Sequence, residues 1–151
     1  MMIEYVRLSK GVLGPQRANP SDAGLDVYSY LPEGKVTIEP GENAIIPTGL
    51  KFGIPHGYML QVCNRSSMGA KRSLVVGAHI IDSGYDGEVF IDLHNIGKEQ
   101  QTVGHYEKIA QIVMVPVVSF RALETTEDNL YKWYPITISD RGDGSLGSTG
   151  Q

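Results

Sequence analysis

LVVGAHIIDSGYDGEVFIDLHN, residues 74–95, is the stretch that decides the fold of this 151-residue chain. A hydrophobic, largely β-branched run stops at Asp82, a turn follows through Ser83 and Gly84, and an alternating run then resumes. This pattern predicts a β-hairpin with an acid at its bend. Because the flanking residues are apolar, we expect the Asp82 carboxylate to be sheltered from bulk water, which makes it a candidate general base. An ordinary hairpin turn has the same composition, so the hairpin alone does not decide the function.

Short strands and frequent turns continue on both sides of the hairpin. Alternation of apolar and polar residues predicts further strands over residues 2–8, 25–30, 35–40 and 109–120. A short helical segment is expected to start near Ser66. The chain shows no alternation of strands with long helices and no internal repeat. The sequence therefore predicts an all-β protein, folded as a jelly-roll β-barrel or sandwich.

The character of the chain changes near its end. Residues 120–139 are polar with scattered aromatic side chains, and the last residues are almost free of hydrophobic anchors. We expect one β-barrel domain over residues 1–138 and a flexible C-terminal segment over residues 139–151.

Composition excludes several classes of function. The net charge is −4 with dispersed Lys and Arg, so no basic stripe for nucleic acid is present. No hydrophobic run approaches the length of a membrane span, and no signal peptide is recognisable at the start. The single Cys63 forms no intrachain disulfide, which fits a reducing compartment. We therefore expect a cytoplasmic protein that binds neither nucleic acid nor membrane.

Three polar segments are candidate phosphate sites. NRSSMG, residues 64–69, offers the guanidinium of Arg65 beside Ser66 and Ser67, a chemistry that suits an anion. The same segment is also typical of a helix cap followed by a solvated Arg. Gln111 is a further candidate donor, and the Gly-rich tail RGDGSLGSTG, residues 141–150, can bring N–H groups against phosphates.

Five segments in this order resemble the five motifs of trimeric dUTP diphosphatases. They are AGLDVYSY (23–30), NRSSMG (64–69), GAHIIDSGYDGEV (77–89), EKIAQIV (107–113) and RGDGSLGSTG (141–150). The resemblance implies a jelly-roll homotrimer with active sites shared between subunits and a tail that closes over the nucleotide. It also implies conversion of dUTP to dUMP and diphosphate with Mg²⁺.

The resemblance assigns roles residue by residue. Asp82 would activate the water that attacks the α-phosphorus. Tyr85 would pack under the deoxyribose, and the backbone of Ala78 and His79 would read the uracil edge. Asp26 would bind water molecules held by Mg²⁺.

The remaining site residues would hold the phosphates and close the lid. The phosphate ligands would be Arg65, Ser66, Ser67 and Gln111, and the lid would close through Arg141, Gly147, Ser148 and Thr149. Two positions depart from the family pattern. Leu146 stands where an aromatic ring is usual, which removes a stack on uracil of about 1 kcal/mol, and His79 stands where Gly is usual.

Two other functions remain open from the sequence. The dCTP deaminases share this fold, and Asp92 stands where that family carries its catalytic Glu; the complete tail resembles the dUTP diphosphatases better. A non-catalytic module that binds nucleotide and signals to a protein partner is the other alternative.

Overall fold

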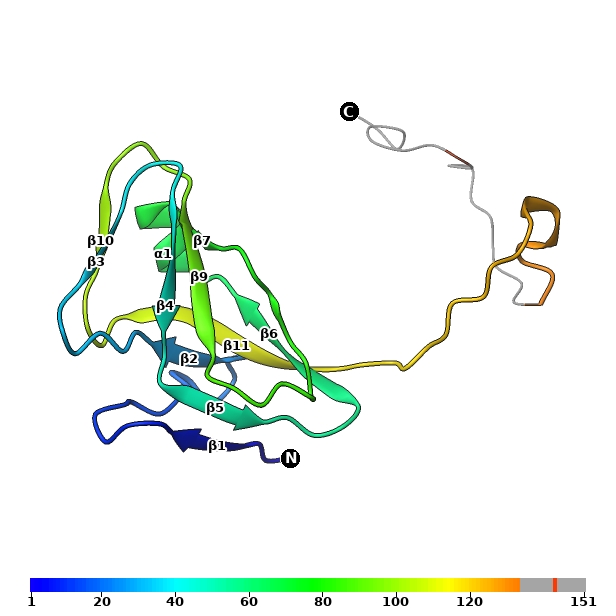
Figure 1. Ribbon diagram of the computed structural model, residues 1–151, viewed down its shortest axis with the longest axis horizontal. Helices are drawn as coiled ribbons and strands as arrows, with labels where there is room; N and C mark the ends of the chain where they lie inside the picture. Colours follow the sequence, from blue (N-terminus) through cyan, green and yellow to red (C-terminus); the bar gives the residue numbers. More distant parts are fainter. Residues whose placement is uncertain (134–142, 144–151) are drawn as a thin grey trace. The chain divides into compact units, whose positions relative to one another are not determined.

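The structure is a computed structural model that describes residues 1–133 and residue 143. The chain divides into two compact units, Met1–Ser119 and Phe120–Gln151 (Figure 1). In the second unit the described residues contain one 3₁₀ helix, η1 (Glu127–Asn129). No described helix has the length and hydrophobicity needed to cross a membrane. The division into residues 1–138 and 139–151 stays a prediction.

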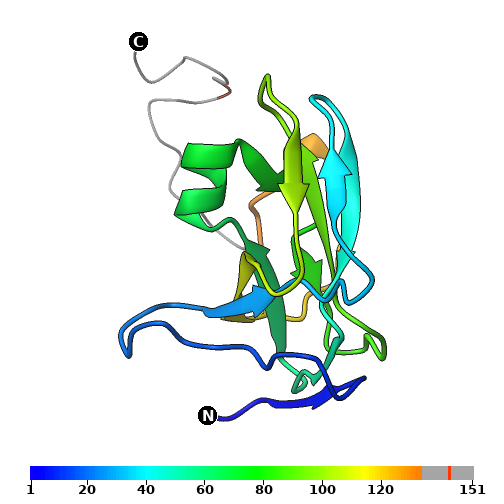
Figure 2. The same ribbon diagram turned by 90° about the vertical axis from the view of Figure 1, so that its left-hand side faces the viewer.

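Strands predominate among the regular elements of the first unit, as expected. Its one described α-helix, α1 (Ser66–Arg72), starts where the sequence predicted a short helix and lies beside β7 (Figure 2). The strands in chain order are β1 (Glu4–Arg7), β2 (Leu25–Tyr28), β3 (Val36–Ile38), β4 (Asn43–Pro47), β5 (Leu50–Gly53), β6 (Tyr58–Cys63), β7 (Leu74–Val76), β8 (Ile80–Ile81), β9 (Phe90–Asn95), β10 (Gln101–Val103) and β11 (Lys108–Pro116).

These strands form four antiparallel sheets. The largest has the order β2-β11-β6-β8, a second has the order β4-β9-β7, and β1-β5 and β3-β10 form two-stranded sheets. None of the sheets in the described part of the chain closes on itself. The predicted all-β class is confirmed, in the form of a sandwich.

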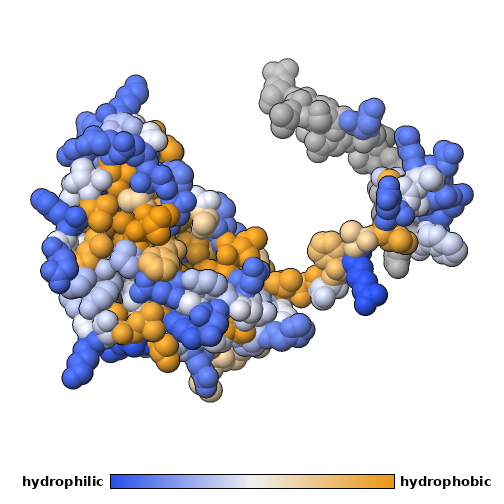
Figure 3. Space-filling model, in the orientation of Figure 1, coloured by the Kyte–Doolittle hydropathy of each residue, from blue (hydrophilic) through white to orange (hydrophobic). Residues whose placement is uncertain are grey.

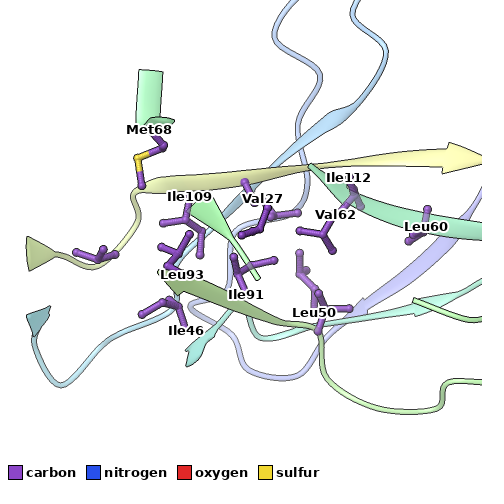
Figure 4. Close-up of a cluster of buried hydrophobic side chains, with 14 of the residues drawn as sticks. Val27, Ile46, Leu50, Leu60, Val62, Met68, Ile91, Leu93, Ile109 and Ile112 are labelled. Atoms are coloured by element: carbon purple, nitrogen blue, oxygen red, sulfur yellow. The ribbon is translucent and has the colours of Figure 1, made fainter. Parts of the chain in front are cut away.

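Alternation along the strands puts one side of each larger sheet into the core. On β9, Ile91 and Leu93 are buried, whereas the alternate residues Phe90, Asp92 and His94 are exposed or half-buried. Val62 on β6 and Ile112 on β11 meet these side chains from the other sheet in one buried cluster (Figure 4). This two-sided burial of apolar area is the main source of stability for such a fold.

The stretch that decides the fold behaves differently from a simple hairpin. β7 pairs with β9, as a hairpin requires. β8, which precedes the bend, pairs with β6 and not with β9, and Ile81 lies opposite Leu60. Asp82 follows β8 at an open turn and is exposed. The expectation that apolar neighbours shelter this carboxylate is therefore wrong within one chain, because the neighbouring Ile80 is itself 64% exposed.

Strand ends also differ from the expected ranges. The strand predicted over residues 109–120 starts at Lys108 and ends at Pro116, whose ring nitrogen carries no hydrogen for further pairing. The short strand β10 was not predicted, since three residues are too few to show alternation.

Candidate functional site

Asp26 is the centre of a charged cluster in the first unit. Arg65 Nε donates to Asp26 Oδ1 at 3.0 Å, and Lys108 Nζ lies 3.1 Å from Asp26 Oδ2. The Asp26 side chain is 13% exposed. Both carboxylate oxygens therefore have a cationic neighbour in a partly desolvated place, where charge-assisted hydrogen bonds are strong.

The guanidinium of Arg65 is held in place by several groups. Besides Asp26, it donates to Ser67 Oγ at 3.4 Å and to the Lys108 carbonyl at 3.3 Å. Arg65 is the N-cap residue of α1, yet its side chain makes no capping hydrogen bond. It is consequently not a solvated Arg before a helix, which was the structural alternative for NRSSMG.

Two serines follow at the start of α1. Ser66 and Ser67 are exposed, and the first backbone hydrogen bonds of the helix run from Met68 and Gly69 to the Arg65 carbonyl, each at 3.1 Å. The N–H groups of the two serines precede these bonds, as the first N–H groups of any helix do. They are open to a ligand beside Arg65.

Gln111 joins this cluster through the sheet. It lies on β11, opposite Asp26 on β2 and opposite Cys63 on β6, and its Nε2 donates to the Asn64 carbonyl at 2.9 Å. Because β11 pairs with both neighbours, segments from three distant parts of the sequence meet here.

The turn after β8 forms a second group. The Tyr85 N–H donates to the Asp82 carbonyl at 3.0 Å, and the Tyr85 hydroxyl donates to the Glu88 carbonyl at 2.6 Å. These bonds fix the ring across the turn. A hollow of about 210 Å³ beside the turn is lined by Ile80, Ile81, Asp82, Tyr85, Glu88, Val89 and Phe90.

Glu88 adds a second carboxyl group to this hollow. Burial raises the pKa of Glu88, and a backbone hydrogen bond from Gly49 opposes that rise.

A larger hollow of about 330 Å³ lies at the back of the same turn, against β1 and β5, where Lys51 pairs with Asp86. Neither Asp82 nor Glu88 lines it.

The segment before β8 is fixed to β6. The Val62 N–H donates to the His79 carbonyl at 2.7 Å, and His79 Nδ1 lies 3.4 Å from the Val62 carbonyl oxygen. The imidazole therefore contacts the backbone of β6. Ala78 and His79 are both exposed.

The two groups of site residues lie apart within one chain. Ile81 pairs with Leu60 in an antiparallel register, so Asp82 comes level with Met59, six residues before Arg65. At about 3.3 Å per strand residue this corresponds to about 20 Å. Among the described residues, no hydrogen bond or ion pair joins Asp82 to the Arg65 cluster.

The donor set at Asp26 meets the needs of Mg²⁺ only together with a substrate. The described part of the chain holds no group of three or more His, Cys, Asp or Glu side chains able to bind a metal. Mg²⁺ commonly keeps several waters and binds through one or two carboxylates plus substrate phosphates. A single carboxylate beside phosphate donors fits that mode of binding and not an all-protein cage.

Sequence reasoning missed two members of the site. Lys108 pairs with Asp26, and Asn64 binds both Gln111 and, through Oδ1, the Val76 N–H at 2.7 Å. Both residues lie within or beside the recognised motifs, so their position was the available signal. The predicted lid residues Arg141, Leu146, Gly147, Ser148 and Thr149 lie outside the described residues.

The fold and the two groups define an all-β protein with a positively charged cluster at a sheet end and an acidic turn. The dUTPase family model matches residues 12–150. The chain belongs to the dUTPase family.

Relatives and solved structures agree with this assignment. The deoxyuridine 5'-triphosphate nucleotidohydrolase of Desulfotalea psychrophila is 39% identical over 130 residues, covering 85% of this chain and 81% of the relative. The protein of that name from Anaplasma marginale is 33% identical and covers 99% of both chains.

Two phage enzymes show the likeness in three dimensions. A variant of the Staphylococcus bacteriophage 80alpha dUTPase, solved with dUpNHpp, has a TM-score of 0.76 and 28% identity and covers 99% of both chains. A variant dUTPase from phage phi11 of S. aureus has a TM-score of 0.76 and 25% identity, covering 85% of this chain and 99% of that one; its structure concerns coordination of a structural Mg(II) ion.

Proposed function

We propose that this chain is a dUTP diphosphatase, which hydrolyses dUTP to dUMP and diphosphate. The observation that carries the proposal is the convergence of Asp26, Arg65 and Gln111 from three sequence-distant segments of a dUTPase-family chain. The relatives' names, deoxyuridine 5'-triphosphate nucleotidohydrolase, support the same activity.

Asp82 acts as the general base. Its carboxylate accepts a proton from the water that attacks the α-phosphorus, and diphosphate leaves on the opposite side. The exposed position of Asp82 at the turn supports this role, because the carboxylate is open to a water molecule and a ligand.

The phosphates bind at the charged cluster. Arg65 and Gln111 donate to phosphate oxygens, and Ser66 and Ser67 add hydroxyl and N–H donors. Since Asp26 and neighbouring groups already orient the Arg65 guanidinium, less ordering entropy is lost when the triphosphate binds.

Sugar and base bind at the hairpin arm. Tyr85, fixed by its hydrogen bond to Glu88, packs under the deoxyribose and leaves no room for a 2′-hydroxyl. The backbone of Ala78 and His79 reads the uracil edge. The His79 carbonyl already accepts from Val62, so the His79 N–H and the Ala78 backbone are the groups that face the base.

Magnesium is the proposed cofactor. Asp26 would hold it through water molecules, together with the substrate phosphates. When bound, the ion neutralises phosphate charge and orients the triphosphate. In the absence of substrate, Lys108 and Arg65 balance the charge of Asp26.

We further propose a homotrimer with shared active sites in the cytoplasm. Asp82 lies level with the start of β6 and Arg65 follows the end of β6, and this separation of about 20 Å exceeds what hydrogen bonding across a single phosphate group can span. Asp82 of one subunit therefore acts with Arg65 of another. A lid formed by residues 139–151 closes the site through Arg141, Gly147, Ser148 and Thr149. Leu146 binds beside the uracil without the aromatic stack.

Deamination of dCTP is the weaker candidate. Its base would be Asp92, but Asn43 Nδ2 donates to Asp92 Oδ1 at 2.8 Å and His94 Nε2 lies 3.0 Å from Asp92 Oδ2. Both oxygens already have partners, which leaves this carboxylate poorly placed as a base.

The test supplies purified protein and Mg²⁺ with dUTP, dCTP, dTTP or UTP and follows monophosphate, diphosphate and ammonia. Selective dUMP and diphosphate are expected from dUTP. Asp82→Asn is expected to keep nucleotide binding and lose hydrolysis by at least about a hundredfold.

The control for this variant is Asp86→Asn, which changes a carboxylate on the same turn that pairs with Lys51. Its hydrolysis should stay near the wild-type rate.

In the substrate test with the wild-type protein, ammonia from dCTP would move the reaction to Asp92. Nucleotide binding without product would favour the non-catalytic module.

A further inference from the structure

The outer side of the β4-β9-β7 sheet carries a polar cluster that the proposed reaction does not use. The Asp92 cluster consists of Asn43, Asp92 and His94, joined by the hydrogen bonds of 2.8 Å and 3.0 Å. Two exposed hydrophobic side chains lie beside it, Ile45 on β4 and Phe90 on β9. Figure 3 shows hydrophobic surface over this part of the molecule. Hydrogen bonds hold these three polar side chains in one arrangement on a surface that the proposed reaction does not use, which indicates a separate role.

The Asp92 cluster lies directly against Gly77. The Gly77 N–H donates to the Asp92 carbonyl at 2.8 Å. A Cβ atom placed on Gly77 would lie 2.3 Å from His94 Nε2 and 2.5 Å from Asp92 Oδ2, closer than real Cβ atoms approach such groups. The side chains of Asp92 and His94 therefore fill the space that any other residue at position 77 would need.

Gly77 directly precedes Ala78 and His79, whose backbone is assigned above to base recognition. This segment, residues 77–79, is held at its two ends, by the Asn64 side chain on the Val76 N–H and by Val62 on the His79 carbonyl. Between these ends, the support comes from β9, through the bond to Gly77 and the packing of the Asp92 cluster. Ala78 itself is exposed.

We infer that Asn43, Asp92 and His94 are positioning residues that hold the backbone of residues 77–79 in the conformation that reads the nucleobase. The inference rests on the proposed function, which gives that backbone its role. The cluster acts through Gly77 and does not touch the reacting atoms, so it sets affinity for the base and not the rate of the chemical step.

The test compares His94→Ala and Asp92→Ala with the wild-type protein in two measurements. Amide hydrogen exchange of residues 77–79 in the full chain is expected to become about tenfold faster. The KM for dUTP is expected to rise about tenfold while kcat stays within about twofold. His94→Gln keeps a nitrogen donor near Asp92 and should restore both values.

His56→Ala is the matched control, because His56 is exposed in the turn between β5 and β6. It should change neither measurement. Asn43→Ala provides a second route if the β9 variants do not fold, since Asn43 is exposed and its loss frees Asp92 Oδ1. It should give a smaller change in the same direction.

Two results would overturn the inference. Unchanged exchange at residues 77–79 would remove the positioning role, and faster exchange with an unchanged KM would remove its link to the base. Failure of the proposed function is a separate outcome, seen as absence of dUTP turnover in the wild-type protein. In that case the exchange measurement alone decides whether the cluster positions the segment.

Discussion

Asp26 shows how one residue depends on its neighbours. Its carboxylate lies between Arg65 and Lys108, and its side chain is largely removed from water. Breaking a partly buried ion pair by removing one member leaves the remaining charges uncompensated. A change at Asp26 is therefore expected to disturb both the phosphate donors and the place proposed for Mg²⁺.

We predict that Asp26→Asn raises the Mg²⁺ concentration needed for half-maximal dUTP hydrolysis by about tenfold, because a neutral amide attracts hydrated Mg²⁺ less strongly. The measurement is a Mg²⁺ titration of activity at saturating dUTP. Glu33→Gln, at an exposed turn, is the control and should leave the titration unchanged. An unchanged midpoint for Asp26→Asn would remove this residue from the metal site.

Asp92 makes the folding stability depend on pH. Burial would raise its pKa, but hydrogen bonds from Asn43 and His94 and the charge of His94 outweigh that effect and hold the pKa below its ordinary value of 3.8. The folded state therefore binds this proton less tightly than the unfolded state. The resulting stability is fully present above pH 3.8 and is lost as the pH falls through the lower folded pKa.

Asp92→Asn is consequently predicted to unfold more easily than the wild type at neutral pH and to lose this difference in acid. Urea unfolding between about pH 2 and pH 7 measures it as the difference in free energy of unfolding. Asp86→Asn should show no such trend. A constant difference across this range would contradict the assigned cause.

At the scale of elements, the β9 strand connects the core to the turns beyond it. Its last residue, Asn95, is 1% exposed, and its Nδ2 donates to the carbonyls of Ile38 at 2.9 Å and Glu99 at 2.7 Å. Its Oδ1 accepts from the Gly97 N–H at 3.0 Å. One amide thus satisfies three backbone groups between β3, β9 and the following turn.

We predict that Asn95→Ala lowers the free energy of unfolding by about 2–3 kcal/mol, because buried backbone groups lose their partners. Urea unfolding monitored by far-ultraviolet circular dichroism measures the change. Asn129→Ala, at an exposed position in η1, is the control. A change of less than about 0.5 kcal/mol at Asn95 would show that water replaces these bonds.

At the scale of the whole molecule, one chain does not bring all proposed site residues together. The register of β6 and β8 puts Asp82 level with the start of β6, whereas Arg65 follows the end of β6, about 20 Å away. Two inactive variants that each lack one of these groups should therefore complement each other. In a mixed trimer, a site can combine Asp82 from one subunit with Arg65 from another.

The prediction is that Asp82→Asn and Arg65→Ala, each inactive alone, regain about one quarter of wild-type activity after mixing and subunit exchange in equal amounts. Light scattering should give about three times the chain mass of 16.5 kDa. Mixing wild type with each variant separately controls for exchange. No recovery in an exchanged trimer would confine the active site to one chain.

The sequence by itself determined the all-β class, the short helix at Ser66 and the order of the motifs, because alternation and turn residues are local properties. Tertiary structure decided which strands pair. It paired β8 with β6 and not with β9, exposed Asp82 and brought Lys108 and Asn64 to the cluster. Which strands pair depends on how the hydrophobic faces of the sheets are buried against one another. Alternation within one strand shows which of its faces is buried but does not show its partner strand.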